Sequence, residues 1–189
     1  MTTTINTLAR VALTILAAGG VISALVWAGP LDPPSGPVVP SYKTLSEIEP
    51  RIAINATNTP GDGNSLFKIT QPGSYYLTAN ITGVVGKHGI EITVSGVTLD
   101  LMGFDLVGVP AMGLYDAVSA TVPGLTNISV FNGSIRGWGD DGIDLSTSLV
   151  GRVEGVSAGA NGSIGVSAGN GFVLDGCSAT GNAVRGIST

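Results

Sequence analysis

The chain has 189 residues, the length of about one domain, and its 29 glycines are roughly twice the ordinary share. Charged residues make up 11% and aromatic residues 5%, so the side chains that build long surface helices are scarce and an all-helical fold is excluded. The net charge is −5 and the basic residues do not cluster, so no nucleic-acid partner is expected. Cys177 is the only cysteine, which excludes a disulfide framework, and we expect a buried, inert thiol.

The first 28 residues have the pattern of an export signal. Arg10 is the only charged side chain before Asp32, and residues 11–28 form an almost unbroken apolar run that ends Val-Trp-Ala. A mature chain beginning near Gly29 would lie outside the cytoplasm, in the medium, the periplasm or at the cell surface. The apolar run is also just long enough to span a bilayer, so residues 1–28 are predicted to be a signal peptide or an uncleaved N-terminal anchor, the only membrane contact expected.

Prolines separate this segment from the rest of the chain, since seven of the ten fall between Pro30 and Pro60. Residues 29–41 are predicted to be an extended Pro-rich linker. Residues 42–88 are predicted to cap the repeats that follow. This cap region would hold a short helical turn ended by Pro50 and two strands, at 66–69 and 75–77.

From Gly89 onward the sequence repeats. A glycine followed by an aliphatic residue recurs at intervals of 24, 29, 23 and 21 residues, at Gly89, Gly113, Gly142, Gly165 and Gly186. A unit of this length, with Gly and Asn turns and no helix signal, fits one coil of a parallel β-helix, whose strands stack about 4.8 Å apart. We therefore predict an all-β fold in which residues 89–189 form a single-stranded parallel β-helix of four to five coils.

The last two units align without a gap, which makes their internal packing predictable. Asn161 falls over Asn182, so we expect an asparagine ladder at a bend of the coil. Cys177 takes the place of Val156 in the stack, which favours a packing role for its side chain. The last unit stops at Gly186–Thr189 without a polar cap, so the chain is expected to be a fragment or a truncated gene product.

Four segments carry a resemblance to a known fold family: 73–77, 97–104, 131–138 and 141–145. They resemble the right-handed parallel β-helix proteins of the pectin-lyase-like fold, in particular exported bacterial ones, over residues 42–189. The resemblance implies right-handed coils, in agreement with the general rule for parallel connections. It does not fix an activity, because lyases, hydrolases, epimerases and adhesins share this scaffold. Met102 departs from the family, in which many coils carry Asn at this bend.

The best candidates for chemistry are Asp140, Asp141 and Asp144. If Ile143 points inward, strand alternation sends Asp144 outward beside the aspartate pair. Two carboxylates several ångströms apart are what glycosidic hydrolysis needs, one as the acid and one as the base. The pair resembles that of polygalacturonases, but the Asn-Thr-Asp and Gly-His-Gly segments of those enzymes are missing. The alternative is that these aspartates are turn residues before Gly142.

The same acidic group could hold Ca²⁺, the one cofactor considered. A pectate-lyase-like elimination is disfavoured, because the chain beyond Gly89 has three arginines against nine carboxylates and would repel a polyuronate. His88 is the only histidine, so neither a Ser-His-Asp set nor a histidine metal site is expected.

Three residues are candidates for substrate binding: Trp138, Tyr115 and Glu91. Trp138 precedes the acidic bend, where its ring either stacks on a sugar or covers the edge of the coil. Glu91, Tyr115 and Asp144 share one column of the repeat alignment. This column is either a carbohydrate-binding strip or a solvated face.

The coil that begins at Gly113 is about six residues too long for the stack, and extra residues inside a strand would turn its side chains to the wrong face. We therefore predict that residues 117–126 form a projecting loop that borders the aspartates.

Two functions remain open from the sequence. The first is an exported β-helix protein that binds or processes polysaccharide or a cell-surface glycan, with hydrolysis by the aspartate pair as its enzymatic form. The second is a non-catalytic surface or adhesive module.

Overall fold

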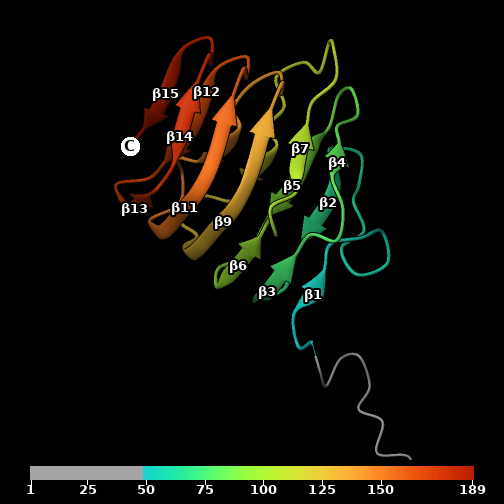
Figure 1. Ribbon diagram of the computed structural model, residues 1–189. Helices are drawn as coiled ribbons and strands as arrows, with labels where there is room; N and C mark the ends of the chain where they lie inside the picture. The colour runs from blue at the N-terminus through green and yellow to red at the C-terminus, as the bar shows by residue number, and fades with distance from the viewer. Residues whose placement is uncertain (1–48) are drawn as a thin grey trace, which may run out of the picture. The chain divides into compact units, whose positions relative to one another are not determined.

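Residues 49–189 are the part of the chain that the computed structural model describes, and their regular structure consists of β-strands (Figure 1). Within these residues no helix is present that could cross a membrane. The predicted signal peptide or anchor at 1–28 and the linker at 29–41 lie outside the described residues. The helical turn expected before Pro50 also falls mostly outside them.

One wall of the molecule is a six-stranded parallel sheet. It contains β2 (Ser65–Ile69), β5 (His88–Ile92), β8 (Val118–Ala120), β10 (Ile143–Leu145), β12 (Ile164–Ala168) and β15 (Arg185–Ser188). Neighbouring strands align so that Ile90, Val118, Ile143 and Val166 form one column, and each of them is fully buried. Alternation along each strand therefore points every second side chain inward, as predicted for Ile143.

The other walls belong to a nine-stranded parallel sheet. It contains β1 (Ile52–Ala53), β3 (Gly73–Tyr76), β4 (Ile81–Thr82), β6 (Val97–Asp100), β7 (Asp105–Val107), β9 (Thr126–Arg136), β11 (Val150–Gly159), β13 (Gly171–Asp175) and β14 (Ser178–Thr180). The long strands β9 and β11 bend at Asn132 and Gly155, which lie opposite each other with φ angles of 67° and 59°. Both residue types tolerate this left-handed backbone, so the sheet turns a corner there.

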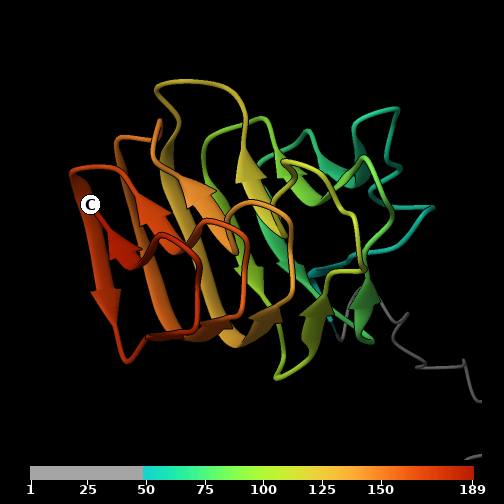
Figure 2. The ribbon, with the colours of Figure 1, turned by 90° about the horizontal axis from the view of Figure 1, so that it is seen from above.

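The two sheets together form a parallel β-solenoid, whose successive coils lie side by side in Figure 2. Six strands in the six-stranded sheet give six turns, more than the four to five predicted. The difference arises because β2 pairs with β5 and β3 with β6. Residues 52–82 are thus coils of the same stack, although the sequence analysis treated them as a cap. The two strands predicted at 66–69 and 75–77 correspond to β2 and β3.

Glycines mark the coils because they lie where the backbone of the next coil passes closest. A Cβ atom at Gly89, Gly142 or Gly165 would lie 2.5 to 2.6 Å from a carbonyl oxygen of the following coil. Gly113, the second of the five predicted markers, does not share this position. Its place in the stack is taken by Ala117, which precedes Val118 as Gly89 precedes Ile90.

Cys177 is only partly buried, but its side chain packs against the core as expected.

Candidate functional site

Three aspartates meet where the chain passes from the nine-stranded sheet into the six-stranded sheet, and we call Asp116, Asp140 and Asp141 the carboxylate corner. Asp116 and Asp141 are buried, at 5% and 8% exposure. The backbone N–H of Asp141 donates to Oδ1 of Asp116 at 2.9 Å, and that of Ile164 donates to Oδ1 of Asp141 at 2.8 Å. Two of the three carboxylates therefore hold one coil to the next.

At neighbouring positions, asparagine side chains accept backbone N–H groups of another coil in the same way. Oδ1 of Asn161 accepts the Trp138 backbone N–H at 3.1 Å, and Oδ1 of Asn182 accepts both the backbone N–H and the Nδ2 of Asn161 at 3.0 Å. The predicted ladder of Asn161 over Asn182 is confirmed. A buried N–H without a partner would be costly, so these side chains stabilise the turns of the coil.

The environment of the corner disfavours negative charge on the two consecutive aspartates. Burial raises the pKa of Asp140, and the nearby Asp116 charge adds to the effect. Burial also raises the pKa of Asp141, although the hydrogen bond from the Ile164 N–H partly opposes it. Asp140 is only half-buried, so it is the carboxyl group of this corner that is open to solvent.

His88 and Tyr115 lie beside these carboxylates. Nδ1 of His88 accepts the Asp116 backbone N–H at 3.1 Å and is 3.3 Å from the carboxylate Oδ2 of the same residue. The Tyr115 ring meets the His88 ring edge-on, with the centroids 5.0 Å apart.

Trp138 is not a sugar-binding residue, because only 1% of it is exposed. Its indole Nε1 donates to the Leu106 carbonyl oxygen at 3.1 Å. The ring fits because Gly83 and Gly89 have no side chains: a Cβ at either would lie 3.1 or 2.9 Å from the indole. Trp138 fills the interior of the coils. The two glycines that leave room for its ring are the feature of the sequence that indicates this buried position.

The predicted strip of Glu91, Tyr115 and Asp144 is wrong in two respects. Glu91 and Asp144 do share an outward column of the six-stranded sheet, but Ser119 lies between them and Tyr115 is in a turn. Glu91 is only 6% exposed. Its carboxylate accepts hydrogen bonds from Ser65 and Thr121 and pairs with Lys68 at 3.1 Å. Burial alone would raise the pKa of Glu91, but these contacts outweigh it and keep the pKa below the usual value. The same contacts occupy the carboxylate, so it is closed to a ligand.

The predicted loop at 117–126 is also wrong, because Val118–Ala120 is the buried strand β8. The turn after it lies against residues 146–149, at the opposite end of the strands from the aspartates: the Gly124 N–H donates to the Thr147 carbonyl oxygen at 2.9 Å. The extra residues of this coil lie within the ten-residue segment 108–117 before β8, because the equivalent segments of its neighbours, 83–87 and 137–142, have five and six residues. This segment brings Tyr115 and Asp116 to the carboxylate corner. An insertion therefore does border the aspartates, but it precedes β8, whereas the predicted loop at 117–126 would have followed from its start.

No group of three or more His, Cys, Asp or Glu side chains within residues 49–189 is arranged to hold a metal ion. The possibility of Ca²⁺ at the acidic bend therefore gains no support from the geometry. Asp144 is the remaining predicted residue, and its Oδ1 accepts both the N–H and the hydroxyl of Ser146, at 3.0 and 2.6 Å. Asp116 and Asp141 thus accept hydrogen bonds from the next coil, whereas Asp144 accepts them within its own turn.

One column of side chains on the outer surface of the nine-stranded sheet was not predicted from the sequence. We call it the aromatic–acid strip; strand register places in it Tyr76, Asp100, Phe131, Glu154 and Asp175. Phe131 is half-buried and, with Asn132, Glu154 and Gly155, lines a shallow hollow of about 410 Å³. The strip could be found only once the strand register was known, since its members are irregularly spaced in the sequence.

Two arginines pair with carboxylates of the strip, and one of them, Arg51, is shared with Glu49 outside it, at 2.8 Å. Arg51 lies over the Tyr76 ring, 4.7 Å from its centroid, and pairs with Asp100 at 3.0 Å. Arg152 pairs with Glu154 at 2.9 Å and with Asp175 at 3.2 Å. Asp100 is 7% exposed, and its carboxylate also accepts from the Met102 N–H and the Asn132 amide, so it is not open to a ligand. The strip therefore offers aromatic rings and the carboxylate oxygens of Glu154 and Asp175, both paired with Arg152.

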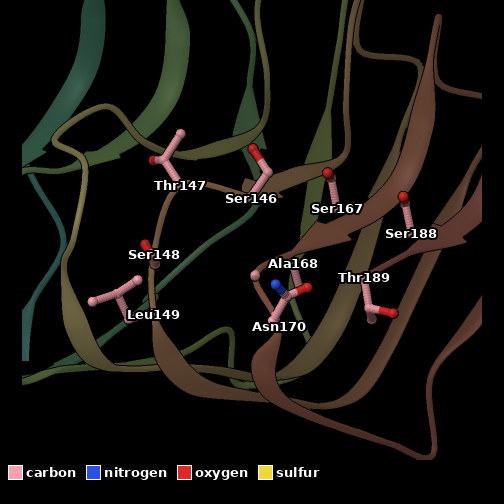
Figure 3. A pocket seen from close by; sticks show the side chains of 10 residues that line it. Ser146, Thr147, Ser148, Leu149, Ser167, Ala168, Asn170, Ser188 and Thr189 are labelled. Atoms are coloured by element: carbon pink, nitrogen blue, oxygen red, sulfur yellow. The ribbon is translucent and has the colours of Figure 1, made fainter.

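A second missed feature is a hollow of about 270 Å³ where three coils leave the six-stranded sheet (Figure 3). We call it the hydroxyl hollow; its lining residues are Ser146, Thr147, Ser148, Leu149, Ser167, Ala168, Gly169, Asn170, Ser188 and Thr189. None of these side chains is charged. Sequence analysis did not single out these serines because polar turn residues are common wherever a chain reverses.

Comparison of the chain with family models, curated protein sequences and solved structures gives no match. The β-solenoid is therefore assigned from the strand pairing alone.

Proposed function

We propose that this protein is an exported, non-catalytic β-solenoid of pectin-lyase-like type that binds a neutral polysaccharide along the aromatic–acid strip. The observation that carries the proposal is the alignment of Tyr76, Phe131, Glu154 and Asp175 in one outward column. The signal-like pattern of residues 1–28 supports export.

The geometry of the column suits a polymer. Strands of a stack are about 4.8 Å apart, so Tyr76 and Phe131, two coils apart, are separated by about 10 Å along the stack. An extended glycan lying along this direction would meet an aromatic ring and carboxylate oxygens in turn. The aromatic ring packs against the apolar face of a sugar, and the carboxylates accept hydrogen bonds from its hydroxyls. The net charge of −5 favours a neutral chain over an acidic one.

The absence of catalysis in this proposal follows from how the corner aspartates are used. Asp116 and Asp141 accept backbone N–H groups of the next coils and are almost fully buried. A glycosidase needs two carboxyl groups that both reach the scissile bond. Asp140 is the only member of the carboxylate corner with an accessible side chain.

The test is binding of the purified chain to cellulose, xylan and mixed-linkage glucan, with polygalacturonate as the acidic comparison. We expect retention on at least one neutral polymer and weaker retention on polygalacturonate. Phe131→Ala should lower the affinity about tenfold, because interface aromatics carry much of the binding energy. Leu114→Ala is the matched control, since Leu114 is an apolar side chain that is 78% exposed and lies outside the strip.

Equal binding by Phe131→Ala and the unchanged protein would rule out the strip. Binding to none of the polymers would favour the purely structural or adhesive module.

A hydrolase remains a second candidate because Asp140 is half-buried and the corner raises its pKa, which suits a general acid. If it acts so, Asp140→Asn should reduce the release of new reducing ends about 100-fold or more. Asp141→Asn provides the comparison, because its carboxylate is engaged with the Ile164 N–H. No release of reducing ends by the unchanged protein would exclude the hydrolase.

A further inference from the structure

Six of the ten residues that line the hydroxyl hollow carry a hydroxyl group. Three consecutive coils supply the lining, at residues 146–149, 167–170 and 188–189. In Figure 3 the hydroxyls of Ser146, Ser167 and Ser188 lie in a row and point the same way. Register places Ser188 beside Ser167, and the residue beside Ser167 on the preceding coil is Asp144, two positions before Ser146.

Two of the hydroxyls donate their protons within the protein. Ser146 donates to Oδ1 of Asp144 at 2.6 Å, and Thr147 donates to the Ala120 carbonyl oxygen at 3.2 Å. Both oxygens keep lone pairs that can accept a hydrogen bond. The donation from Ser146 occupies one oxygen of Asp144, the residue that pairs with Ser167 across neighbouring strands.

Ser148 is the decisive residue. It is 2% exposed, and its hydroxyl is the one buried side-chain polar atom among residues 49–189 that has no hydrogen-bond partner. Native proteins satisfy nearly all such groups, because an unpaired buried polar atom is destabilising. The hydroxyl has essentially no exposed surface of its own, so a molecule in the hollow meets it only after rotation about its single χ1 bond turns it toward the hollow.

We propose that the hydroxyl hollow binds one neutral sugar unit, with Ser148, Ser167 and Ser188 as its hydrogen-bonding residues. The ligand class follows from the lining: hydroxyls and the Asn170 amide can both donate and accept, which matches a polyhydroxylated ligand, and no charged side chain is present to select an ion. Small-molecule pockets are about 300–1,000 Å³ for drug-sized ligands, so a hollow of about 270 Å³ admits a single ring rather than a chain. This site lies on the six-stranded sheet and is independent of the aromatic–acid strip.

The experiment is a titration of the full chain with glucose, galactose, mannose and xylose, and with glucuronate as the charged comparison, followed by amide NMR. We expect saturable shifts confined to residues 146–149, 167–170 and 188–189 with at least one neutral sugar, and none with glucuronate. Ser148→Ala should weaken this binding about threefold to tenfold, the equivalent of one hydrogen bond. Because the variant removes an unpaired hydroxyl, its Tm should be unchanged or higher, so weaker binding would not reflect poor folding.

Ser178→Ala is the matched control, because Ser178 is an exposed serine of the nine-stranded sheet whose hydroxyl donates to Ser157. It should bind the sugar like the unchanged protein. Phe131→Ala should also keep the NMR response, even where it abolishes polymer binding, so the failure of one proposal is distinguishable from that of the other. The inference is overturned if no neutral sugar gives saturable shifts at the hollow, or if Ser148→Ala binds as tightly as the unchanged protein.

Discussion

The two ends of the six-stranded sheet solve the same problem differently. Where the chain enters the sheet, Asp116, Asp141 and Asn161 are buried and accept backbone N–H groups from neighbouring residues or coils. Where the chain leaves it, the turns are built from serine and threonine, and the Ser148 hydroxyl is unpaired. The difference teaches that buried polar groups whose hydrogen bonds are complete hold the stack together. An incomplete set marks a place where something else can bind.

Removing the Trp138 side chain should cause the largest loss of stability at the end where the chain enters the six-stranded sheet. Trp138→Ala leaves a cavity beside Gly83 and Gly89, so the free energy of unfolding should fall by about 3–5 kcal/mol. Urea denaturation followed by circular dichroism measures it. Leu114→Ala should stay within about 0.5 kcal/mol of the unchanged protein, as expected for an exposed side chain. A similarly small loss for Trp138→Ala would contradict its placement in the interior.

Asn161→Ala sharpens the comparison between the two ends. It leaves the Trp138 backbone N–H without an acceptor, so a loss of about 2–3 kcal/mol is expected in the same measurement. Asn170→Ala changes an exposed asparagine at the exit end and should cost no more than about 0.5 kcal/mol. Equal losses from the two substitutions would remove the distinction between the ends.

The smallest expected change in stability comes from the charge of Asp140 in the carboxylate corner. The folded state raises the pKa of Asp140 above its ordinary value of 3.8, so the folded chain holds this proton more tightly than the unfolded chain. The resulting stability is present below pH 3.8 and is lost as the pH rises through the raised value. Asp140→Asn should therefore be more stable than the unchanged protein at pH 7, by up to about 1 kcal/mol, and lose this advantage in acid. Thermal unfolding across pH 3 to 8 tests it, and a less stable variant at pH 7 would show that the carboxylate is needed where it is.

The sequence predicted the coil type because the features that define it are local. Glycine precedes an aliphatic residue wherever the next coil passes close by, and Asn161 and Asn182 fall at the same point of two units of equal length. The same reasoning missed the first coils, since β2 carries Leu66 and Phe67 where later coils have glycine and an aliphatic residue. It also chose Gly113, a turn residue that imitates the marker, over Ala117.

The candidate site was less predictable because it depends on register between coils. An error of four residues in one coil exchanged Tyr115 for Ser119 in the outward column and moved the insertion to the wrong end of β8. Trp138 shows the same limit, since its burial depends on two glycines that lie 55 and 49 residues earlier in the chain. The aromatic–acid strip and the hydroxyl hollow each need three or more coils in correct alignment before they exist as surfaces.

The stacking of parallel strands also determines how the molecule would respond to mechanical load. Hydrogen bonds between coils run along the axis of the stack, and each coil contacts only its neighbours (Figure 2). Tension along this axis acts on one coil-to-coil seam at a time, so coils should peel off in sequence at low force. Tension across the axis would instead strain several seams together. A solenoid held at its two ends would thus yield in steps of one coil, whereas one held by its sides would resist as a single block.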